Sequence, residues 1–280
     1  MKFTRAVFWS VLIAVTSWCA LLQAAEAQNA FTQGVNYHRA GKLKEAIAAY
    51  DRAIKADPKA AAAYLARGTA YAKLGETYQA TKDYDEALRL NPDLADAYYY
   101  RGTAYASVKQ YDTAIKDFDE AIKRNPKFAE AYTNRGSIYA KLGQFEKAVQ
   151  DFNQGIKLNP KDSDAYDARG LAHRRLGQHE LAVQDYTESI KLSPKNPETY
   201  NNRGNSNSLL GKYDLAIKDY DEALKLDSKN AKIYANRGMI KLRQGQREEA
   251  QKDFTKAAEI DPSLKEKLES IMTSAPAVKK

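Results

Sequence analysis

The chain has 280 residues, of which 44% are hydrophobic and 29% are charged, so a buried core is feasible and extensive disorder is excluded. Its 44 Lys and Arg residues outnumber its 36 Asp and Glu residues, which gives a formal net charge of +8. One cysteine, Cys19, and three histidines exclude a disulfide scaffold and a cysteine-rich zinc site, and they leave little room for a histidine metal site.

Residues 1–27 have the pattern of a secretory signal peptide. Lys2 and Arg5 form a short basic segment, residues 6–22 are uncharged and mostly apolar, and Ala25-Glu26-Ala27 is a small-x-small cleavage pattern. We expect cleavage after Ala27, with the mature chain periplasmic or secreted. The apolar run of 17 residues is also at the lower limit of a membrane span. An uncleaved anchor at 6–22 is therefore the alternative, and contact with a membrane is expected only in that case.

The rest of the chain repeats with a period of 34 residues. Counted from Ala27, seven repeats follow one another without an insertion, and the seventh ends at Leu264. Position 8 is glycine in every repeat: Gly34, Gly68, Gly102, Gly136, Gly170, Gly204 and Gly238. Position 15 is glycine in every repeat except the third, which has Lys109, and position 20 is always alanine. Position 32 is proline in six repeats.

These positions predict two helices in each repeat. Apolar or small residues recur at helical spacing over positions 2–14 and again over positions 18–30. The glycine at position 15 ends the first helix, because the left-handed conformation carries little strain only for glycine. The proline at position 32 cannot continue the second helix. The small residues at positions 8 and 20 indicate where the two helices approach closely.

Repeat 2 carries the pattern most completely, at Gly68, Tyr71, Ala80, Tyr84, Ala87 and Pro92. With the 34-residue period, these residues resemble the tetratricopeptide repeat (TPR), and the resemblance extends over residues 27–264. It implies an all-α, right-handed superhelical solenoid of helix pairs whose first helices line the concave side. One such unit cannot bury its apolar face alone, so we expect the seven units to form one array.

The predicted organisation has three parts: a signal peptide at 1–27, seven tandem TPR units at 28–264, and a capping helix with a flexible tail at 265–280. Leu264, Leu268, Ile271 and Met272 fall on one face of a helix. A helix of this kind covers the apolar end of a repeat array.

Position 7 departs from the family pattern, which is apolar there. It is arginine in repeats 2 to 7, position 23 is aspartate in the same six repeats, and repeat 1 changes both together, to Gln33 and Ala49. This agreement favours a structural ion pair between the two helices of a repeat over a ladder of exposed arginines that binds an acidic ligand. The predicted pairs are Arg67 with Asp83, Arg101 with Asp117, Arg135 with Asp151, Arg169 with Asp185, Arg203 with Asp219, and Arg237 with Asp253.

The resemblance implies that ligands contact first-helix positions that include 5, 6 and 9, and these positions vary among the repeats. We predict a binding groove with apolar contacts toward the N-terminal repeats and amide contacts to a peptide backbone toward the C-terminal ones. Its predicted residues are Phe31, Leu65, Tyr99, Thr103, Asn134, Asn201, Asn202, Asn205 and Asn236. The position-6 asparagines of repeats 4, 6 and 7 resemble the peptide-holding ladder in the TPR domain of O-GlcNAc transferase. The alternative is that these positions are merely solvated and tolerant of change.

No residue pattern indicates catalysis, a cofactor or a metal site. The Asp-Tyr-Asp-Glu strings at 83–86 and 219–222 recur at the repeat period and include a position paired with arginine, so we interpret them as structural. His173 and His179 have no cysteine or third histidine nearby and are expected to be surface residues. Lysines are interspersed with acidic residues, whereas nucleic-acid binding favours a concentrated basic stripe.

The sequence therefore predicts a non-enzymatic scaffold or adaptor that binds a protein or peptide partner outside the cytoplasm and does not bind nucleic acid. The alternative function is a membrane-tethered accessory subunit of an envelope complex, anchored by residues 6–22. A third class, an enzyme, would require activity in the purified mature chain.

Overall fold

The computed structural model describes the backbone of residues 2–274 and the side chains of residues 18 and 21–274. Within residues 2–274 every regular element is a helix and there is no strand, which confirms the predicted all-α class. The chain divides into two compact units, Met1–Asn134 and Arg135–Lys280. The division falls inside one helix, and each unit is described by itself below.

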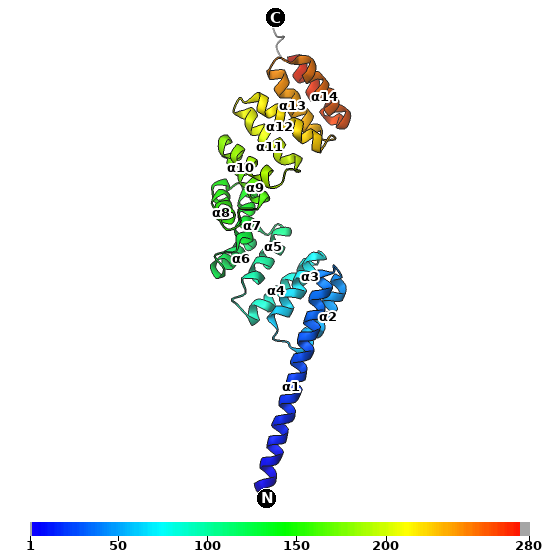
Figure 1. The fold of residues 1–280 in the computed structure, drawn as a ribbon, viewed down its shortest axis with the longest axis vertical. Coiled ribbons are helices and arrows are strands. Elements are labelled where there is room, and N and C mark those ends of the chain that lie inside the picture. The colour runs from blue at the N-terminus through cyan, green and yellow to red at the C-terminus, as the bar shows by residue number, and fades with distance from the viewer. Residues whose placement is uncertain (1, 275–280) are drawn as a thin grey trace. The chain divides into compact units, whose positions relative to one another are not determined.

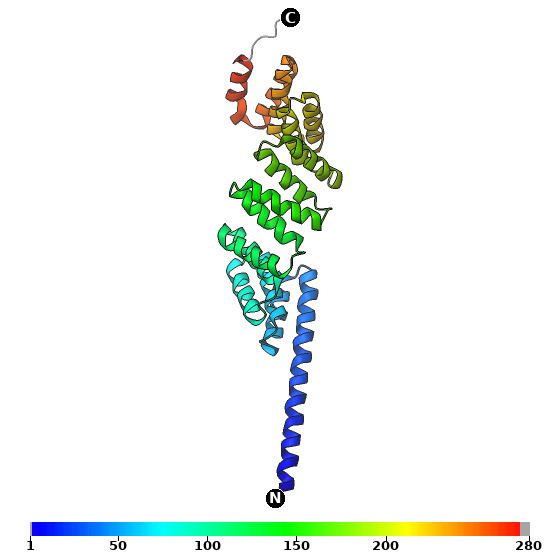
Figure 2. The ribbon, with the colours of Figure 1, turned by 90° about the vertical axis from the view of Figure 1, so that its left-hand side faces the viewer.

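The N-terminal unit contains six whole helices and the start of a seventh (Figures 1 and 2). They are α1 (Lys2–Arg39), α2 (Leu43–Ala56), α3 (Ala61–Lys73), α4 (Thr77–Leu90), α5 (Ala95–Ser107), α6 (Tyr111–Arg124) and α7 (Ala129–Lys141).

The C-terminal unit contains the end of α7 and the elements that follow it. These are α8 (Phe145–Leu158), α9 (Ser163–Arg175), α10 (His179–Leu192), α11 (Pro197–Leu209), α12 (Tyr213–Leu226), α13 (Ala231–Arg243), α14 (Arg247–Ile260), the 3₁₀ turn η1 (Pro262–Leu264) and α15 (Lys265–Ser274).

Helices pack on their neighbours in the chain, as expected for a solenoid of helix pairs. The two helices of one repeat pack together, for example α3 with α4 and α11 with α12. The second helix then packs on the first helix of the next repeat, as α4 does on α5 and α12 on α13. Since each helix contacts mainly its neighbours along the chain, the units are confirmed as TPR-type stacks.

Glycine at position 8 allows the two helices of a repeat to come together. A Cβ atom on Gly34 would lie 2.4 Å from the ring of Tyr50, and one on Gly68 would lie 2.7 Å from the ring of Tyr84. The aromatic residue at position 24 therefore packs directly on the backbone of the first helix. These rings are among the most buried side chains of the structure: Tyr50, Tyr84, Phe118, Phe152, Tyr186, Tyr220 and Phe254.

The turn between the two helices has the same left-handed residue in repeat after repeat. The six glycines at position 15 have φ between 73° and 81°, as the sequence predicts. Lys109 takes the same conformation at φ 62° in repeat 3. It keeps the hydrogen bonds of the turn, including Gln110 N to the Tyr105 carbonyl at 2.9 Å. Lys109 therefore carries backbone strain that the glycines avoid, while the hydrogen bonds of the turn are kept.

The second helix ends in a polar turn that the sequence pattern did not indicate. Position 31 is Asp or Asn in six repeats, and its side-chain oxygen accepts the N–H two residues on. In repeat 2, for example, Asp93 N donates to Asn91 Oδ1 at 3.0 Å. The N–H of position 33 follows the proline and lies outside the helix, and this turn gives it a hydrogen-bond acceptor.

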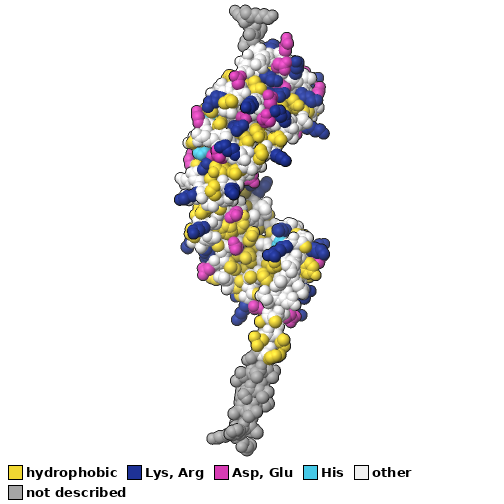
Figure 3. Space-filling view, in the orientation of Figure 1, with side chains coloured by type: hydrophobic (Ala, Val, Ile, Leu, Met, Phe, Trp, Pro, Cys, Tyr) yellow, Lys and Arg dark blue, Asp and Glu magenta, His cyan; other side chains and the backbone are white. Residues whose placement is uncertain are grey.

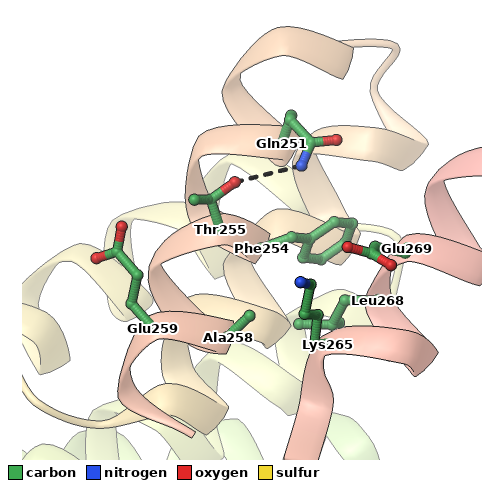
Figure 4. A pocket seen from close by; sticks show the side chains of 8 residues that line it. All are labelled: Gln251, Phe254, Thr255, Ala258, Glu259, Lys265, Leu268 and Glu269. Carbon is green, nitrogen blue, oxygen red and sulfur yellow. Dashed lines mark hydrogen bonds between the residues drawn. The ribbon is translucent and has the colours of Figure 1, made fainter. Parts of the chain in front are cut away.

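The last repeat is covered by α15. Leu268 and Met272 are buried against α14, where they contact Ala250, Phe254 and Ala257. Figure 4 shows Leu268 of α15 beside Phe254 of α14. A hollow of about 280 Å³ remains between the two helices, bordered by polar side chains such as those of Gln251 and Lys265. The helix lies where the sequence predicts a cap.

The predicted signal peptide is continuous in backbone with the first repeat, since α1 runs from Lys2 to Arg39 without interruption. Its C-terminal part packs on α2, where Phe31 and Val35 lie against the buried Tyr50. The side chains of residues 1–17, 19 and 20, which form most of the predicted leader, lie outside the described residues. Among the residues that are described, no helix is long and apolar enough to span a bilayer.

Replacing Lys109 with glycine should stabilise the protein by about 1 kcal/mol, because glycine removes the left-handed strain and no contact of the turn requires the lysine side chain. Urea unfolding followed by circular dichroism measures the effect. The matched control is Gly75→Lys in the same turn of repeat 2, which should destabilise by a similar amount. Equal midpoints for Lys109→Gly and the parent chain would contradict the argument.

Candidate functional site

The structure brings together all six predicted Arg–Asp pairs. In each, Arg Nη2 lies 2.6 or 2.7 Å from Asp Oδ1. The arginine Nε donates to the other carboxylate oxygen, as Arg67 does to Asp83 at 2.8 Å. The aspartates are only 4–6% exposed, so each pair is a largely buried, two-pronged contact between the helices of one repeat.

The same arginines also reach back to the preceding repeat. Arg67 Nη1 lies 2.5 Å from Asp51, and Arg237 Nη1 lies 2.6 Å from Asp221, at position 25 of the repeat before. Arg101 uses Asp85 in this way, Arg169 uses Asn153 and Arg203 uses Thr187. Hydrogen bonding to Asp83 and then to Asp51 raises the pKa of Arg67 above its ordinary value. The hydrogen-bond acceptors at position 25 could have indicated this contact from the sequence, but the predictions did not include it.

A tyrosine at position 4 completes this cluster. The guanidinium carbon lies 5.5–5.7 Å from the ring centre of the tyrosine three residues earlier in repeats 2, 3, 5, 6 and 7. The tyrosines are Tyr64, Tyr98, Tyr166, Tyr200 and Tyr234. This ring shields one side of the arginine, which strengthens its contacts with the carboxylates.

Position 11 adds a second donor to the buried aspartate in the C-terminal unit. Asn207 Nδ2 donates to Asp219 at 2.9 Å, and Lys241 Nζ lies 3.0 Å from Asp253. His173 occupies the same place near Asp185, with a longer Nε2–Oδ2 distance of 3.8 Å. The expectation of a surface residue at His173 is therefore wrong: it is 9% exposed and lies 2.6 Å from Gln178 Oε1.

The predicted groove amides bind one another. Asn236 Nδ2 donates to Asn201 Oδ1 at 3.0 Å and to Asn205 Oδ1 at 3.2 Å. Asn134 Nδ2 donates in the same way to the Tyr99 hydroxyl at 3.0 Å. Position 6 of one repeat thus bonds to position 5 of the repeat before, a link of 35 residues that the column pattern alone did not reveal.

The remaining predicted groove residues are only partly free. Phe31 and Leu65 are half-buried, with Phe31 5.8 Å from the Tyr50 ring centre and Leu65 packed against the core of repeat 2. Thr103 is exposed but donates to the Tyr99 carbonyl at 2.9 Å. Asn202 is half-buried, and within the described residues its amide makes no hydrogen bond. Their role in binding stays a prediction.

An open pocket of about 510 Å³ lies between the first helices of repeats 4 and 5. Its lining includes three apolar side chains, those of Phe145 and Phe152 on α8 and Leu171 on α9. It also includes two exposed cations, Lys141 and Arg175. The rest of the lining is made of small residues: Ser137, Ala140, Gly143, Ala168 and Ala172. The predicted groove residues include none of these, although Leu171 at position 9 and the cations at position 13 were visible in the sequence.

Asp167, at position 5 of repeat 5, is a carboxylate without a cation. Its Oδ1 is buried and has no hydrogen-bond partner. Burial raises the pKa of Asp167 above its ordinary value of 3.8, hydrogen bonding from the Thr199 side chain lowers it in part, and the nearby Asp164 and Glu198 raise it further. No cation is among the groups that act on the pKa of Asp167, whereas an arginine pairs with each of the six aspartates at position 23.

Among the residues with described side chains, no three His, Cys, Asp or Glu residues are grouped so that they could hold a metal ion. On the face seen in Figure 3, Lys and Arg side chains of the C-terminal unit stand among Asp and Glu side chains.

Family models described as tetratricopeptide repeat match residues 61–94, 95–128, 129–162, 197–230 and 231–264. A model described as TPR repeat matches residues 34–75 and 170–211, so together the models cover well over half of the chain. No curated protein was found to match the chain.

Three solved structures illustrate the similarity. MamA is 27% identical with a TM-score of 0.54, and the match covers 61% of this chain and 93% of that one. A tetratricopeptide repeat protein from Parabacteroides merdae ATCC 43184 is 22% identical with a TM-score of 0.61, covering 89% and 100%. YrrB is 21% identical with a TM-score of 0.59, covering 70% and 97%. At these last two identities the likeness shows the fold alone.

Replacing Asp83 with alanine should destabilise the protein by about 3 kcal/mol, because it leaves the half-buried Arg67 without its main partner. Changing Arg67→Met together with Asp83→Ala should cost less than Asp83→Ala alone. Urea unfolding of the two single variants and the double variant gives the coupling energy. Additive effects, with no coupling between the two sites, would contradict a structural pair.

Replacing Asp167 with asparagine should stabilise the protein at pH 7 by about 1 kcal/mol, because it removes an unpaired buried charge. The folded pKa is raised, so the ionised carboxylate destabilises the fold at pH 7, and this penalty is lost as the pH falls through the folded pKa toward 3.8. Thermal unfolding at pH 7 and pH 3 should show the gain only at pH 7. The control is Glu180→Gln, an exposed acid on α10 that is not among the groups acting on the pKa of Asp167, and it should give no gain. A gain at both pH values for Asp167→Asn would contradict the electrostatic cause.

Proposed function

The chain belongs to the tetratricopeptide repeat family, and on that premise we propose that it is a non-enzymatic scaffold that binds an extended polypeptide along its first helices. Repeats of this family serve as protein–protein interaction scaffolds. The observation that carries the finer proposal is the pocket between α7 and α9, whose lining combines apolar side chains with two exposed cations.

The pocket suits one apolar side chain of a bound polypeptide. Phe145, Phe152 and Leu171 offer apolar contact, and Lys141 and Arg175 lie where a nearby carboxylate of the partner would be attracted. The amides of Asn201, Asn205 and Asn236 lie further along the same unit, already oriented by their mutual hydrogen bonds. A donor network held in this way loses little freedom when it contacts a peptide backbone.

One similar structure supports a peptide ligand by analogy. YrrB is described as a TPR protein with an unusual peptide-binding site. The analogy concerns the class of ligand only, and the residues proposed here come from the pocket of this chain.

We further propose that the chain acts outside the cytoplasm after removal of residues 1–27. Lys2, Arg5, the apolar run at 6–22 and the Ala25-Glu26-Ala27 pattern support this location. The alternative is a membrane-tethered subunit that keeps residues 6–22 as an anchor. N-terminal sequencing of the protein isolated from its native cell separates the two: a start at Gln28 favours export with cleavage, and a start at Met1 favours the anchor.

The binding proposal predicts that Leu171→Trp fills the pocket and raises the Kd for a bound peptide at least about tenfold. The measurement is fluorescence polarisation with peptides selected by the parent chain from a random decapeptide array. Leu181→Trp, on the exposed face of the second helix α10, is the matched control and should bind as the parent does. Unchanged binding by a folded Leu171→Trp variant would refute the pocket as the binding site.

A further inference from the structure

We propose that a hollow beside Tyr78, lined by residues of α4 and of the turn between α5 and α6, is a binding site for a neutral carbohydrate. This Tyr78 hollow lies in the N-terminal unit, and none of its residues is among those of the predicted groove. The inference goes beyond the proposed binding of a polypeptide and does not rest on it.

The Tyr78 hollow is large enough for a small ligand. Its volume of about 660 Å³ falls within the range of about 300–1,000 Å³ that is usual for small-molecule sites. Helix α4 contributes Thr77, Tyr78 and Thr81 to the lining, and the turn after α5 contributes Val108 and Gln110. The two sides therefore belong to repeats 2 and 3, whose helices α4 and α5 pack together.

Two threonines of repeat 2 lie where other repeats have large apolar side chains. In repeats 1, 4 and 6, the residues at positions 17 and 21 pack against a buried core cluster. These residues are Leu43, Ile47, Phe145, Val149, Tyr213 and Ile217. In repeat 2 the same positions are Thr77 and Thr81. The shorter side chains leave space at this place, and they replace apolar surface with hydroxyl groups.

The ring of Tyr78 is exposed where the other repeats carry a charge. Position 18 is Lys, Asp or Glu in the other six repeats. Tyr78 is 76% exposed, more than any other large hydrophobic residue for which side chains are described. The face of an aromatic ring is electronegative and attracts polarised C–H groups, which a sugar ring presents on its own faces. An exposed ring beside a hollow is therefore suited to stacking against a sugar.

Polar groups of both kinds surround this ring. Lys82 and Asp85 of α4 line the Tyr78 hollow together with Gln110. Asp85 is directed by Arg101, whose Nη1 lies 2.5 Å from Asp85 Oδ1, and the carboxylate is still 56% exposed. Within the described residues, the side chains of Lys82 and Gln110 make no hydrogen bond or ion pair. Sugar hydroxyl groups donate and accept, so a carboxylate, an amide and an ammonium group can all bind them.

The charges of the lining favour a neutral ligand. The lining contains one cation, Lys82, and one carboxylate, Asp85. An anionic ligand would be attracted by the first and repelled by the second, and a cationic ligand would meet the reverse. A neutral ligand with many hydroxyl groups gains hydrogen bonds from both without either penalty.

A polypeptide is the other class of ligand for an open hollow, and the residues favour it less. An apolar side chain of a partner would gain most from the large apolar residues that other repeats have at positions 17 and 21. Thr77 and Thr81 remove part of that apolar area, which lowers the free energy gained by burying an apolar side chain. The same change adds hydrogen-bond partners for a sugar. Thr81 Oγ1, for example, donates to the Tyr78 carbonyl at 3.0 Å and keeps its capacity to accept.

The test titrates the full chain with four neutral tetrasaccharides: cellotetraose, maltotetraose, mannotetraose and chitotetraose. Isothermal titration calorimetry should give a Kd of about 1 mM or lower for at least one of them. Failure of all four to bind with a Kd below about 10 mM would overturn the site.

Variants then locate the binding. Thr81→Ile restores the residue type of other repeats and should fill the Tyr78 hollow, which raises the Kd at least about tenfold. Tyr78→Asp should weaken binding similarly, whereas Tyr78→Trp keeps an aromatic face and should bind at least as tightly as the parent chain. The matched control is Thr113→Ile, the same change at an exposed place on α6, which should not alter the Kd. Thermal unfolding checks that each variant is folded.

The outcomes separate this site from the peptide site. Leu171→Trp should leave carbohydrate affinity unchanged, and Thr81→Ile should leave peptide affinity unchanged. Carbohydrate affinity that is equal in the parent chain and in Thr81→Ile would overturn the proposal, as would equal losses in Tyr78→Trp and Tyr78→Asp. Loss of peptide binding in Thr81→Ile would assign the Tyr78 hollow to a polypeptide and would also overturn it.

Discussion

The arginine at position 7 is the interaction on which the stack depends. Its planar guanidinium reaches the buried aspartate of its own repeat, an acceptor on the second helix of the repeat before, and the ring of a tyrosine on its own helix, as Arg67 does with Asp83, Asp51 and Tyr64. A lysine has no fork with which to serve two directions at once. Because one side chain fixes both the pairing of two helices and the spacing to the next pair, small changes there alter more than one interface.

Much of the fold could be predicted because the same packing problem is solved seven times. Glycine at positions 8 and 15 reports a close approach and a left-handed turn, and both are properties of a single repeat that recur in register. The Arg–Asp pairing was accessible for the same reason, since the two positions change together in repeat 1. Agreement between the columns of a repeat is a form of consistency between local and global structure.

What could not be predicted lies between repeats or in single departures from the pattern. The hydrogen bond from Asn236 to Asn201 joins different positions of neighbouring repeats, so comparing like positions does not reveal it. The acceptors at position 25 are chemically mixed, Asp221 in one repeat and Thr187 in another, which hides their common role. His173 was misread because its partner Asp185 lies across the turn, on the other helix.

Seven aspartates of the first and second helices differ in how their charge is compensated. Six of them, at position 23, lie under an arginine and are nearly inaccessible, so they hold helices together and have no capacity left for a ligand. Asp167 is half-buried near two more acids, and no cation is among the groups that act on its pKa. Its ionised form therefore lowers the free energy of unfolding. A repeat array can tolerate that cost at one position because its other interfaces are built independently. Position 5 is apolar or neutral in the other repeats, so the charge of Asp167 adds nothing to the packing that those repeats share.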